Sequence, residues 1–418
     1  MRITELGPQA SAPQVRALAP QAREVESDVR AIVDDVRRRG DAAVLELTER
    51  FDRAELAPGG LRVEPAELDA AVAILPPDVL SALRTAMANV KAVAETGLRS
   101  STATELPQGQ RVEVVEVPVR RVAAYVPAGR AAYPSTLVML AVTAQAAGVE
   151  EIAVCAPPGP EGRAHPVILA ACTLCGVTEV YRMGGAQAIA ALAYGTESVP
   201  AVDVIAGPGN RWVQEAKRQV AGVVGIDGIA GPSELVVVAD GGQDPEPIAL
   251  DLLAQAEHGD DGLLVLVSPD RDLLEAVGGA LERMAGDRAS VASPPCALVR
   301  ASDMAAAVRL ADQIAPEHLE LIGPEAESHL TDVRAAGCVF VGEDAATAFG
   351  DYVAGSNHVL PTGGAARYGS ALSPATFRRR MARVSLPGGA AARLAPAGAA
   401  LARAEGFPVH AESMERRA

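Results

Sequence analysis

The feature that most constrains the fold is a regular alternation of strand-like and helix-like runs along the middle of the chain. Apolar runs typical of buried strands begin near residue 111 and take turns with longer runs of helical periodicity. Strands are predicted at Arg111–Val119, Arg121–Val126, Glu151–Ala156, Glu179–Met183, Val202–Ala206 and Val223–Asp227, and helices at Ser135–Gly148, His165–Gly176, Gly185–Tyr194 and Asn210–Val220. This order predicts a mostly parallel sheet covered by helices.

The alternation restarts after Gly231-Pro232. Further strands are predicted at Leu235–Ala239, Leu263–Val267, Ala297–Arg300, Leu319–Ile322 and Cys338–Val341, and helices at Pro247–His258, Arg271–Met284, Asp303–Ile314 and Glu327–Ala336. We therefore expect an α/β fold with two Rossmann-like, doubly wound parallel-sheet units of roughly 105 residues each.

The two ends of the chain differ from this middle part. A chain of 418 residues is too long for one ordinary core, so several domains are expected. The first hundred residues show helical periodicity, and from about Pro374 the chain is predicted to be helical again and to end in a polar tail. The predicted division is a helical N-terminal region (1–110), a first Rossmann-like unit (111–232), a second unit (233–373) and a helical C-terminal tail (374–418).

Charge and cysteine content narrow the possible partners and compartments. The formal net charge of −16 disfavours binding to nucleic acid. The first ten residues lack an apolar signal core, and the most apolar helical run, Ser135–Val149, is short for a membrane span. Five cysteines, an odd number, predict free thiols in a reducing compartment, and Cys172 and Cys175 lie in an apolar run that predicts core packing. We therefore expect a cytoplasmic protein.

Four loops beside predicted strands are rich in glycine. They are Val126-Pro127-Ala128-Gly129, Gly184-Gly185-Ala186-Gln187, Gly207-Pro208-Gly209-Asn210 and Gly231-Pro232-Ser233-Glu234. Ligands of open α/β sheets bind beyond the carboxyl ends of the strands, where glycine lets the backbone approach and helix N-termini attract anions. None of the four completes G-x-G-x-x-G, and each alone is more typical of an ordinary turn. Together they favour a nucleotide or another polar ligand.

Four of the six histidines lie beside acids or amides. These groups are Gln255 with His258, Glu317 with His318, Asp351 with His358, and Glu405 with His410. Nitrogen and oxygen donors without thiolate, such as Gln255, His258, Asp351 and His410, suit a catalytic zinc or manganese ion. Sequence spacing alone does not assemble this set, because solvated helix ends and surface polar pairs have the same composition.

Longer motifs in the same regions resemble the signature region of the histidinol dehydrogenase family. They are the run from Gly184 to Ser198, Gly207-Pro-Gly-Asn210, Glu215-Ala-Lys-Arg-Gln219, Gly231-Pro-Ser-Glu234, Ala254-Gln-Ala-Glu-His-Gly259, Ala315-Pro-Glu-His-Leu319 and the segment from Gly350 to Pro361. The similarity extends over nearly the whole chain, from Arg39-Gly-Asp-Ala-Ala43 to the tail.

The resemblance implies a role for each matching residue. Glu317 and His318 would be the acid–base pair, and Tyr125, Gln187 and Asn210 would contact NAD. The implied zinc ligands, one ion per subunit, are Gln255, His258, Asp351 and His410. The implied substrate contacts are Ser233, His358 and Glu405 together with Gln255, His258, His318, Asp351 and His410. The residues between and after Glu405 and His410 diverge from the family pattern.

The family reaction consists of two NAD-dependent oxidations at one site, from L-histidinol through the aldehyde to L-histidine. Glu317 is the group that would activate water for the second oxidation, because no cysteine lies in a motif loop. The zinc would then anchor the substrate. The family also implies a homodimer with shared active sites. Two alternatives remain at this point: a related enzyme that oxidises another primary alcohol, and a metal-binding or ligand-sensing protein that has lost catalysis.

Overall fold

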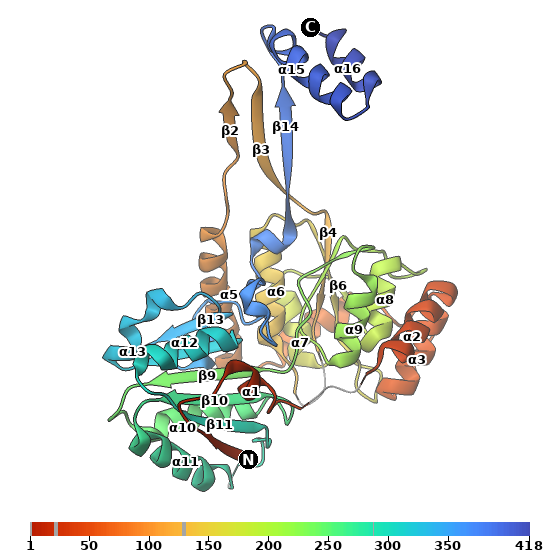
Figure 1. Ribbon diagram of the computed structural model, residues 1–418. Helices are drawn as coiled ribbons and strands as arrows, with labels where there is room; N and C mark the ends of the chain where they lie inside the picture. Colours follow the sequence, from red (N-terminus) through yellow and green to blue (C-terminus); the bar gives the residue numbers. More distant parts are fainter. Residues whose placement is uncertain (1, 21–23, 128–130, 287) are drawn as a thin grey trace.

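The structure, a computed structural model, describes residues 2–20, 24–127, 131–286 and 288–418 (Figure 1). Its first parallel sheet has the strand order β6-β5-β4-β7-β8. The strands are β4 (Arg121–Tyr125), β5 (Glu151–Cys155), β6 (Glu179–Tyr181), β7 (Val204–Ala206) and β8 (Gly225–Ile226). Counted from β4, this is the order 3-2-1-4-5 of a doubly wound unit, as predicted.

Helices cover both faces of this sheet because its strands are apolar on both sides. Val122 and Ala124 of β4 pack on one face under α6 and α7, while Ala123 and Tyr125 pack on the other under α8 and α9. These helices are α6 (Pro134–Ala146), α7 (Pro166–Leu174), α8 (Gly185–Tyr194) and α9 (Arg211–Val220). N-terminal helices add an outer layer: α2 (Glu26–Arg39) and α3 (Asp41–Asp52) pack on α8, α4 (Pro65–Ala73) on α7, and α5 (Pro77–Thr96) on α6.

The second parallel sheet repeats this order with one added strand, as β1-β11-β10-β9-β12-β13. Its strands are β9 (Glu234–Ala239), β10 (Leu263–Ser268), β11 (Pro295–Arg300), β12 (His318–Ile322) and β13 (Cys338–Val341). One face packs against α10 (Pro245–Ala256) and α11 (Arg271–Ala285), and the other against α12 (Met304–Ile314) and α1 (Ala12–Arg16).

The added strand corrects the expectation that the first hundred residues are helical. β1 (Arg2–Leu6) pairs in parallel with β11, so that Ile3 lies opposite Cys296. The pairing covers a sheet edge that would otherwise expose unpaired backbone groups. A strand of five residues whose partner lies almost 300 positions away leaves little local signal, and the helical pattern of residues 25–36 dominates the region.

A second correction concerns an antiparallel sheet that projects from the rest of the molecule (Figure 1). Its order is β14-β3-β2, with β2 (Thr102–Glu105), β3 (Arg111–Pro118) and β14 (Arg378–Ser385). The strand predicted at Arg111–Val119 therefore lies outside the first parallel sheet, and the segment after Pro374 is a strand before it becomes α15 (Ala390–Ala404) and α16 (Pro408–Glu415). We call β2, β3, β14, α15 and α16 together the arm. The division of the chain at residues 110, 232 and 373 stays a prediction.

Three local predictions also differ from the structure. The helix expected at Glu327–Ala336 is replaced by α13 (Pro324–Ser328) and a short 3-10 turn, because Asp312 Oδ1 accepts hydrogen bonds from the backbone N–H groups of Arg334 and Ala335 and holds that segment irregular. The glycine-rich segment around Asp351 predicts a loop, but Asp351 lies in α14 (Thr347–Tyr352); Pro316-Glu317-His318 predicts a turn or short helix, but His318 begins β12. Residues 128 and 129 of the first glycine-rich loop lie outside the described residues.

All five cysteines are free, as predicted, and Cys172 and Cys175 pack in the core of the first sheet. Within the described ranges, none of the helices combines the length and the apolar character that a membrane span requires.

A buried ion pair fixes the loop that follows β7. The ammonium of Lys217 is 1% exposed, pairs with Asp227 and donates to the carbonyl of Gly207 at 3.1 Å. The same carboxylate accepts a hydrogen bond from the N–H of Gly207 at 2.8 Å. Gly207 has φ +133°, and a Cβ there would lie 2.1 Å from the carbonyl oxygen of Tyr125, so only glycine fits.

We predict that Lys217→Met lowers the free energy of unfolding by about 3–5 kcal/mol, because it leaves the carboxylate of Asp227 buried without a counter-ion. Chemical denaturation measures the loss. The double variant Lys217→Met/Asp227→Leu removes both charges and should regain most of the lost stability. Equal losses in the single and double variants would contradict the prediction.

Candidate active site

The sequence-predicted acid–base pair lies where β9 and β12 begin. The two strands are neighbours in register, with His318 opposite Leu235. Glu317 precedes β12 and is 7% exposed, and His318 is 3% exposed. Both residues thus lie at the amino end of β12, which corrects the expectation that the site loops of both sheets follow strand carboxyl ends.

Two hydrogen bonds hold the carboxyl of Glu317, and a third supports one of the two donors. The hydroxyl of Ser233 donates to Oε2 at 2.6 Å and the backbone N–H of Glu234 donates to the same atom at 2.8 Å. The Nε2 of Gln255 in turn donates to Ser233 Oγ, so this hydroxyl connects Gln255 to Glu317. Burial raises the pKa of Glu317 to about 8, although both direct hydrogen bonds oppose the rise. A carboxyl with this pKa both gives and takes protons near neutral pH.

His318 is fixed beside this carboxyl as a neutral imidazole. Its Nδ1 lies 3.1 Å from the carbonyl oxygen of Glu234 and 3.5 Å from Oε2 of Glu317. Its Nε2 lies 3.7 Å from Oδ1 of Asp351. Burial lowers the pKa of His318, against the opposing effect of Asp351. When Nδ1 carries the proton and donates to Glu234, Nε2 presents its lone pair as a base.

Three of the four predicted metal ligands lie around the acid–base pair. Gln255 lies in the last turn of α10 and is 4% exposed. His258 follows the same helix, and burial together with the nearby His318 lowers its pKa, which favours the neutral form that binds metals. Burial raises the pKa of Asp351 to about 6. These residues supply amide, imidazole and carboxylate donors, a mixture that fits zinc.

The tail residues are not part of this cluster. Glu405 ends α15, and His410 lies in α16, exposed, with its ring 5.4 Å from that of Phe407. Figure 1 shows both helices at the far end of the arm, away from both parallel sheets. Across the described parts of the chain, no three His, Cys, Asp or Glu side chains come close enough to hold a metal ion. One chain therefore leaves the predicted four-ligand set incomplete.

His358 connects this cluster to the first sheet. Its Nδ1 lies 2.7 Å from the carbonyl oxygen of Asp351, and its Nε2 lies 3.1 Å from the hydroxyl of Thr136 at the start of α6. Burial lowers the pKa of His358 to about 4, so the ring is neutral near pH 7. Because α6 follows β4, the carboxyl edge of the first sheet meets the site at the amino edge of the second.

The three predicted NAD contacts lie together on the first sheet. Tyr125, Gln187 and Asn210 line one cavity of about 1260 Å³ beyond the carboxyl ends of β4, β6 and β7. The hydroxyl of Tyr125 accepts a hydrogen bond from the N–H of Gly185 at 3.0 Å. Asn210 caps α9 through its side-chain oxygen, which accepts from the N–H groups of Trp212 and Val213.

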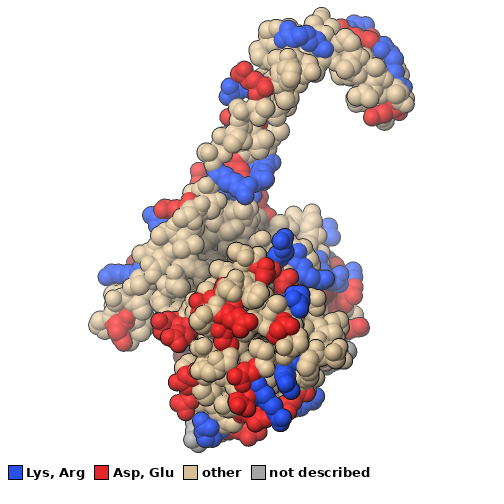
Figure 2. Space-filling view, turned by 60° about the vertical axis from the view of Figure 1, so that its left-hand side comes forward, with Lys and Arg blue, Asp and Glu red and all other residues tan. Residues whose placement is uncertain are grey.

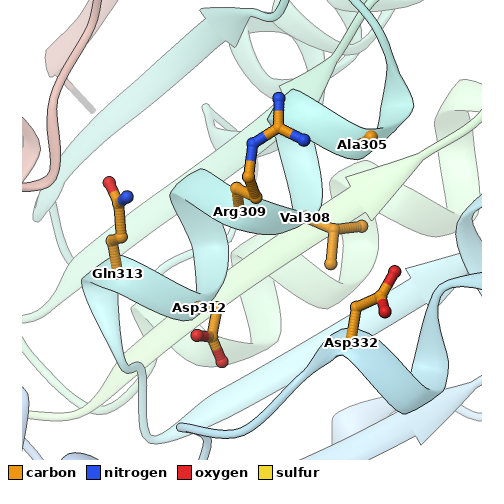
Figure 3. A pocket seen from close by; sticks show the side chains of 6 residues that line it. All are labelled: Ala305, Val308, Arg309, Asp312, Gln313 and Asp332. Atoms are coloured by element: carbon orange, nitrogen blue, oxygen red, sulfur yellow. The ribbon is translucent and has the colours of Figure 1, made fainter.

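A smaller hollow of about 350 Å³ lies between α12 and the 3-10 turn and is separate from both sites (Figure 3). Its acids already have partners: Asp312 accepts from the backbone of residues 334 and 335, and Asp332 pairs with His329. We assign it a structural role.

The chain was compared with known proteins and structures. The family model described as histidinol dehydrogenase matches residues 16–418. This chain belongs to the histidinol dehydrogenase family. A histidinol dehydrogenase of Synechococcus sp. is 45% identical over 91% of this chain and 89% of its own length, and one of Zymomonas mobilis is 44% identical over 91% and 90%. The crystal structure of histidinol dehydrogenase from Elizabethkingia anophelis matches with a TM-score of 0.93 and 30% identity, over 100% of this chain and 98% of that one.

Some residues that hold the site have no role in the sequence analysis. Arg16 of α1 donates to the carboxylate of Glu234 at 2.9 Å and, through Nε, to the carbonyl of Ile314 at 2.8 Å. The N–H of Gly363 also donates to Glu234, at 3.1 Å. The sequence signal for Glu234 is an acid at the first position of an apolar run. Its partners Arg16 and Gly363 lie far from it in the sequence, so spacing does not reveal them.

Glu320 was also missed, although an acid in the middle of an apolar strand is an available signal. Strand alternation places Glu320 on the same side of β12 as His318. Its Oε1 accepts from the N–H of Thr347 at 2.9 Å and from the Thr347 hydroxyl at 2.6 Å, at the start of the helix that carries Asp351. Burial and the nearby Asp251 of α10 raise the pKa of Glu320. Glu320 thus joins β12 to α14 beneath the site, near Asp251 of α10.

We predict that Glu320→Gln makes the protein less sensitive to rising pH. The folded-state pKa of Glu320 lies above its unfolded value, so wild-type stability declines as pH rises from the unfolded value through the folded one. Glutamine keeps the acceptor for Thr347 and offers an N–H group to Asp251. The variant should be more stable than wild type at pH 8, by about 1–3 kcal/mol, and gain less at pH 5. Thermal unfolding at both pH values measures this, and identical pH profiles would contradict it.

Proposed function

We propose that this protein is a zinc- and NAD-dependent histidinol dehydrogenase that oxidises L-histidinol through L-histidinaldehyde to L-histidine, with two NAD reduced. The observation that carries the proposal is the buried carboxyl of Glu317, held by Ser233 and adjacent to the neutral imidazole of His318. Two oxidations at one site need a base for the alcohol and a group that activates water for the aldehyde, and this pair supplies both.

In the first oxidation, Nε2 of His318 accepts the proton of the substrate hydroxyl, while the carbon that bears this hydroxyl would give a hydride to a bound NAD. In the second, Glu317 takes a proton from a water molecule, whose oxygen adds to the aldehyde carbon. Loss of a hydride from this anionic hydrate to a second bound NAD would then yield the carboxylic acid. Burial raises the thiol pKa of each of the five cysteines, which supports water rather than a thiolate as the nucleophile.

NAD fits the cavity lined by Tyr125, Gln187 and Asn210, because this is the carboxyl edge of a doubly wound sheet. The substrate side is formed by Ser233, His358 and the proposed zinc ligands Gln255, His258 and Asp351. A bound zinc ion would anchor the imidazole and amine of the substrate. Glu405 and His410 would complete this site from a partner subunit.

The arm supports a homodimer with shared active sites. Val384, Leu401 and Val409 on the arm are 63%, 66% and 73% exposed, which is typical of surfaces that another subunit covers. Figure 2 shows a band of basic groups across the base of the arm, while acidic and basic groups are interspersed over the body of the molecule. Two-fold dimers are the commonest assembly. In such a dimer of this chain, the tail of each subunit would reach the site of the other. The free cysteines support a cytoplasmic location.

The acid–base assignment predicts that Glu317→Gln blocks the second oxidation more than the first. Glutamine keeps the shape of the side chain but removes the base, so aldehyde oxidation should slow by about 10²–10⁴-fold. The measurement is the ratio of NADH formed to histidinol consumed. It should be two in the wild type and fall towards one in the variant as aldehyde accumulates.

A variant in which all five cysteines are replaced by Ala or Ser serves as the control and should keep the ratio of two. Loss of only the second oxidation in that variant would refute the water mechanism. NADH formation from other primary alcohols but not from histidinol would refute the proposed substrate.

Shared active sites predict complementation between two inactive chains. A heterodimer of a His258→Ala chain and a His410→Ala chain has one doubly altered site and one intact site, so it should show about half of wild-type activity by counting sites. Differently tagged chains allow the heterodimer to be purified and assayed. Zinc content, measured in parallel, should also return to about half.

The matched control pairs His258→Ala with Asp351→Ala. Both changes lie outside the tail, so each site of that heterodimer keeps one lesion and stays inactive. An inactive His258→Ala/His410→Ala heterodimer would show that the tail does not act in the partner's site.

A further inference from the structure

Asp52 is a partly buried carboxylate in an unfavourable position. It is the last residue of α3, where the helix dipole disfavours negative charge. Among the described residues, its Oδ2 is buried and has no hydrogen-bond partner. Burial raises the pKa of Asp52 to about 6, so the ionised form opposes folding at neutral pH. A buried polar atom left unsatisfied in this way points to a partner that is absent from the free protein.

The side chain of Asp52 lines the cavity that holds the proposed NAD contacts. Tyr125, Gln187 and Asn210 line the same cavity, and the charge of Asp52 acts on the hydroxyl of Tyr125. The loop after β5 contributes Pro157, Pro158 and Glu161 to the wall. The cavity therefore extends from the carboxyl ends of the strands to the end of α3.

Doubly wound units that bind NAD usually place an acid at the end of the second strand, where it binds the hydroxyls of the adenosine ribose. The second strand of this unit is β5, and the residues that follow it are Ala156, Pro157 and Pro158. The next acid, Glu161, is exposed. The usual ribose acceptor is thus missing from the strand end, while α3 brings a partly buried acid into the same cavity from outside the sheet.

The remaining charged groups of the cavity are paired or exposed. Glu67 pairs with Arg182, while Glu161 and Arg163 are exposed. Asp52 is the acid in the described lining whose buried oxygen lacks a partner.

We propose that Asp52 accepts hydrogen bonds from the hydroxyl pair of the adenosine ribose and that its charge selects NAD over NADP. The inference rests on the proposed NAD dependence and adds the residue that recognises this half of the cofactor. A 2′-hydroxyl supplies the missing donor to the carboxylate, whereas a 2′-phosphate would place a second negative charge against it in a partly buried site.

The test is calorimetric binding of NAD, NADP and nicotinamide 2′-deoxyadenosine dinucleotide to the dimeric protein and its variants. Wild type should bind NAD about 10- to 100-fold more tightly than the 2′-deoxy compound, the range expected for a hydrogen bond to a charged acceptor. In Asp52→Asn this difference should shrink to a few-fold, and the preference for NAD over NADP should fall by at least about tenfold. Glu55→Gln, an exposed acid of the same loop outside the cavity lining, is the matched control and should bind all three as wild type does.

The outcomes separate the two proposals. A wild-type protein that binds no NAD would refute the proposed cofactor itself. Tight NAD binding with equal affinity for NADP or for the 2′-deoxy compound would refute only the role of Asp52, and this result does not depend on any variant. Unchanged affinity ratios in Asp52→Asn would refute it as well. Thermal unfolding at pH 8 shows whether the variant is folded, and removal of a destabilising carboxylate should leave its melting temperature equal or higher.

Discussion

The catalytic geometry depends on the backbone of one residue, Glu234, at the start of β9. Its N–H donates to Glu317 and its carbonyl oxygen lies 3.1 Å from Nδ1 of His318, so one peptide unit on each side of Glu234 orients one member of the acid–base pair. The side chain of Glu234 is 5% exposed and is held by Arg16 and by the N–H of Gly363. Because Arg16 also binds the carbonyl of Ile314, the N-terminal helix α1 ties the end of α12 to the start of β9. A buried ion pair contributes little net stability but fixes a geometry, and here the geometry it fixes is that of the pair.

The two sheets use opposite edges for their parts of the site. The first sheet follows the rule for open α/β folds, because its candidate cofactor residues lie beyond the carboxyl ends of β4, β6 and β7. The second sheet departs from it: Ser233, Glu317 and His318 lie where β9 and β12 begin. The departure has a physical use. The carboxyl edge of a parallel sheet presents residues of the loops that lead into helices, so two carboxyl edges facing one site would supply loop residues only. An amino edge instead offers strand residues such as His318, whose position is fixed by ladder pairing on both sides.

Local periodicity predicted the helices and strands whose own residues show the spacing of a buried helix or strand. The helix Gly185–Tyr194 and the strand Cys338–Val341 have the predicted bounds, because apolar runs with glycine or turn residues at their ends identify buried elements. It failed for β1 and β14, which are strands only because of distant partners. Arg378–Ser385 pairs with β3, more than 260 positions earlier, and nothing in its arginine-rich sequence distinguishes it from an exposed helix. For the site, the motifs identified Glu317, His318 and the candidate ligands, but spacing could not reveal Arg16 or Asp52, whose roles depend on which elements meet in space.

The distribution of raised carboxyl pKa values links the stability of this fold to its proposed ligands. Burial raises the pKa of five carboxyls: Asp52, Glu317 and Asp351 line the proposed cofactor and substrate sites, Glu320 supports the second of these, and Asp251 lies near Glu320. A carboxyl needed only for folding would have its pKa lowered by an ion pair, as the partly buried Glu215 has beside Arg218. The ionised forms of these buried acids lack such a partner, and a hydroxyl, an amine or a metal cation of a ligand would stabilise them. Ligands that bind the folded chain but not the unfolded one raise the free energy of unfolding. The proposed cofactor and substrate would do so at the buried carboxyls, whose ionised forms otherwise oppose folding.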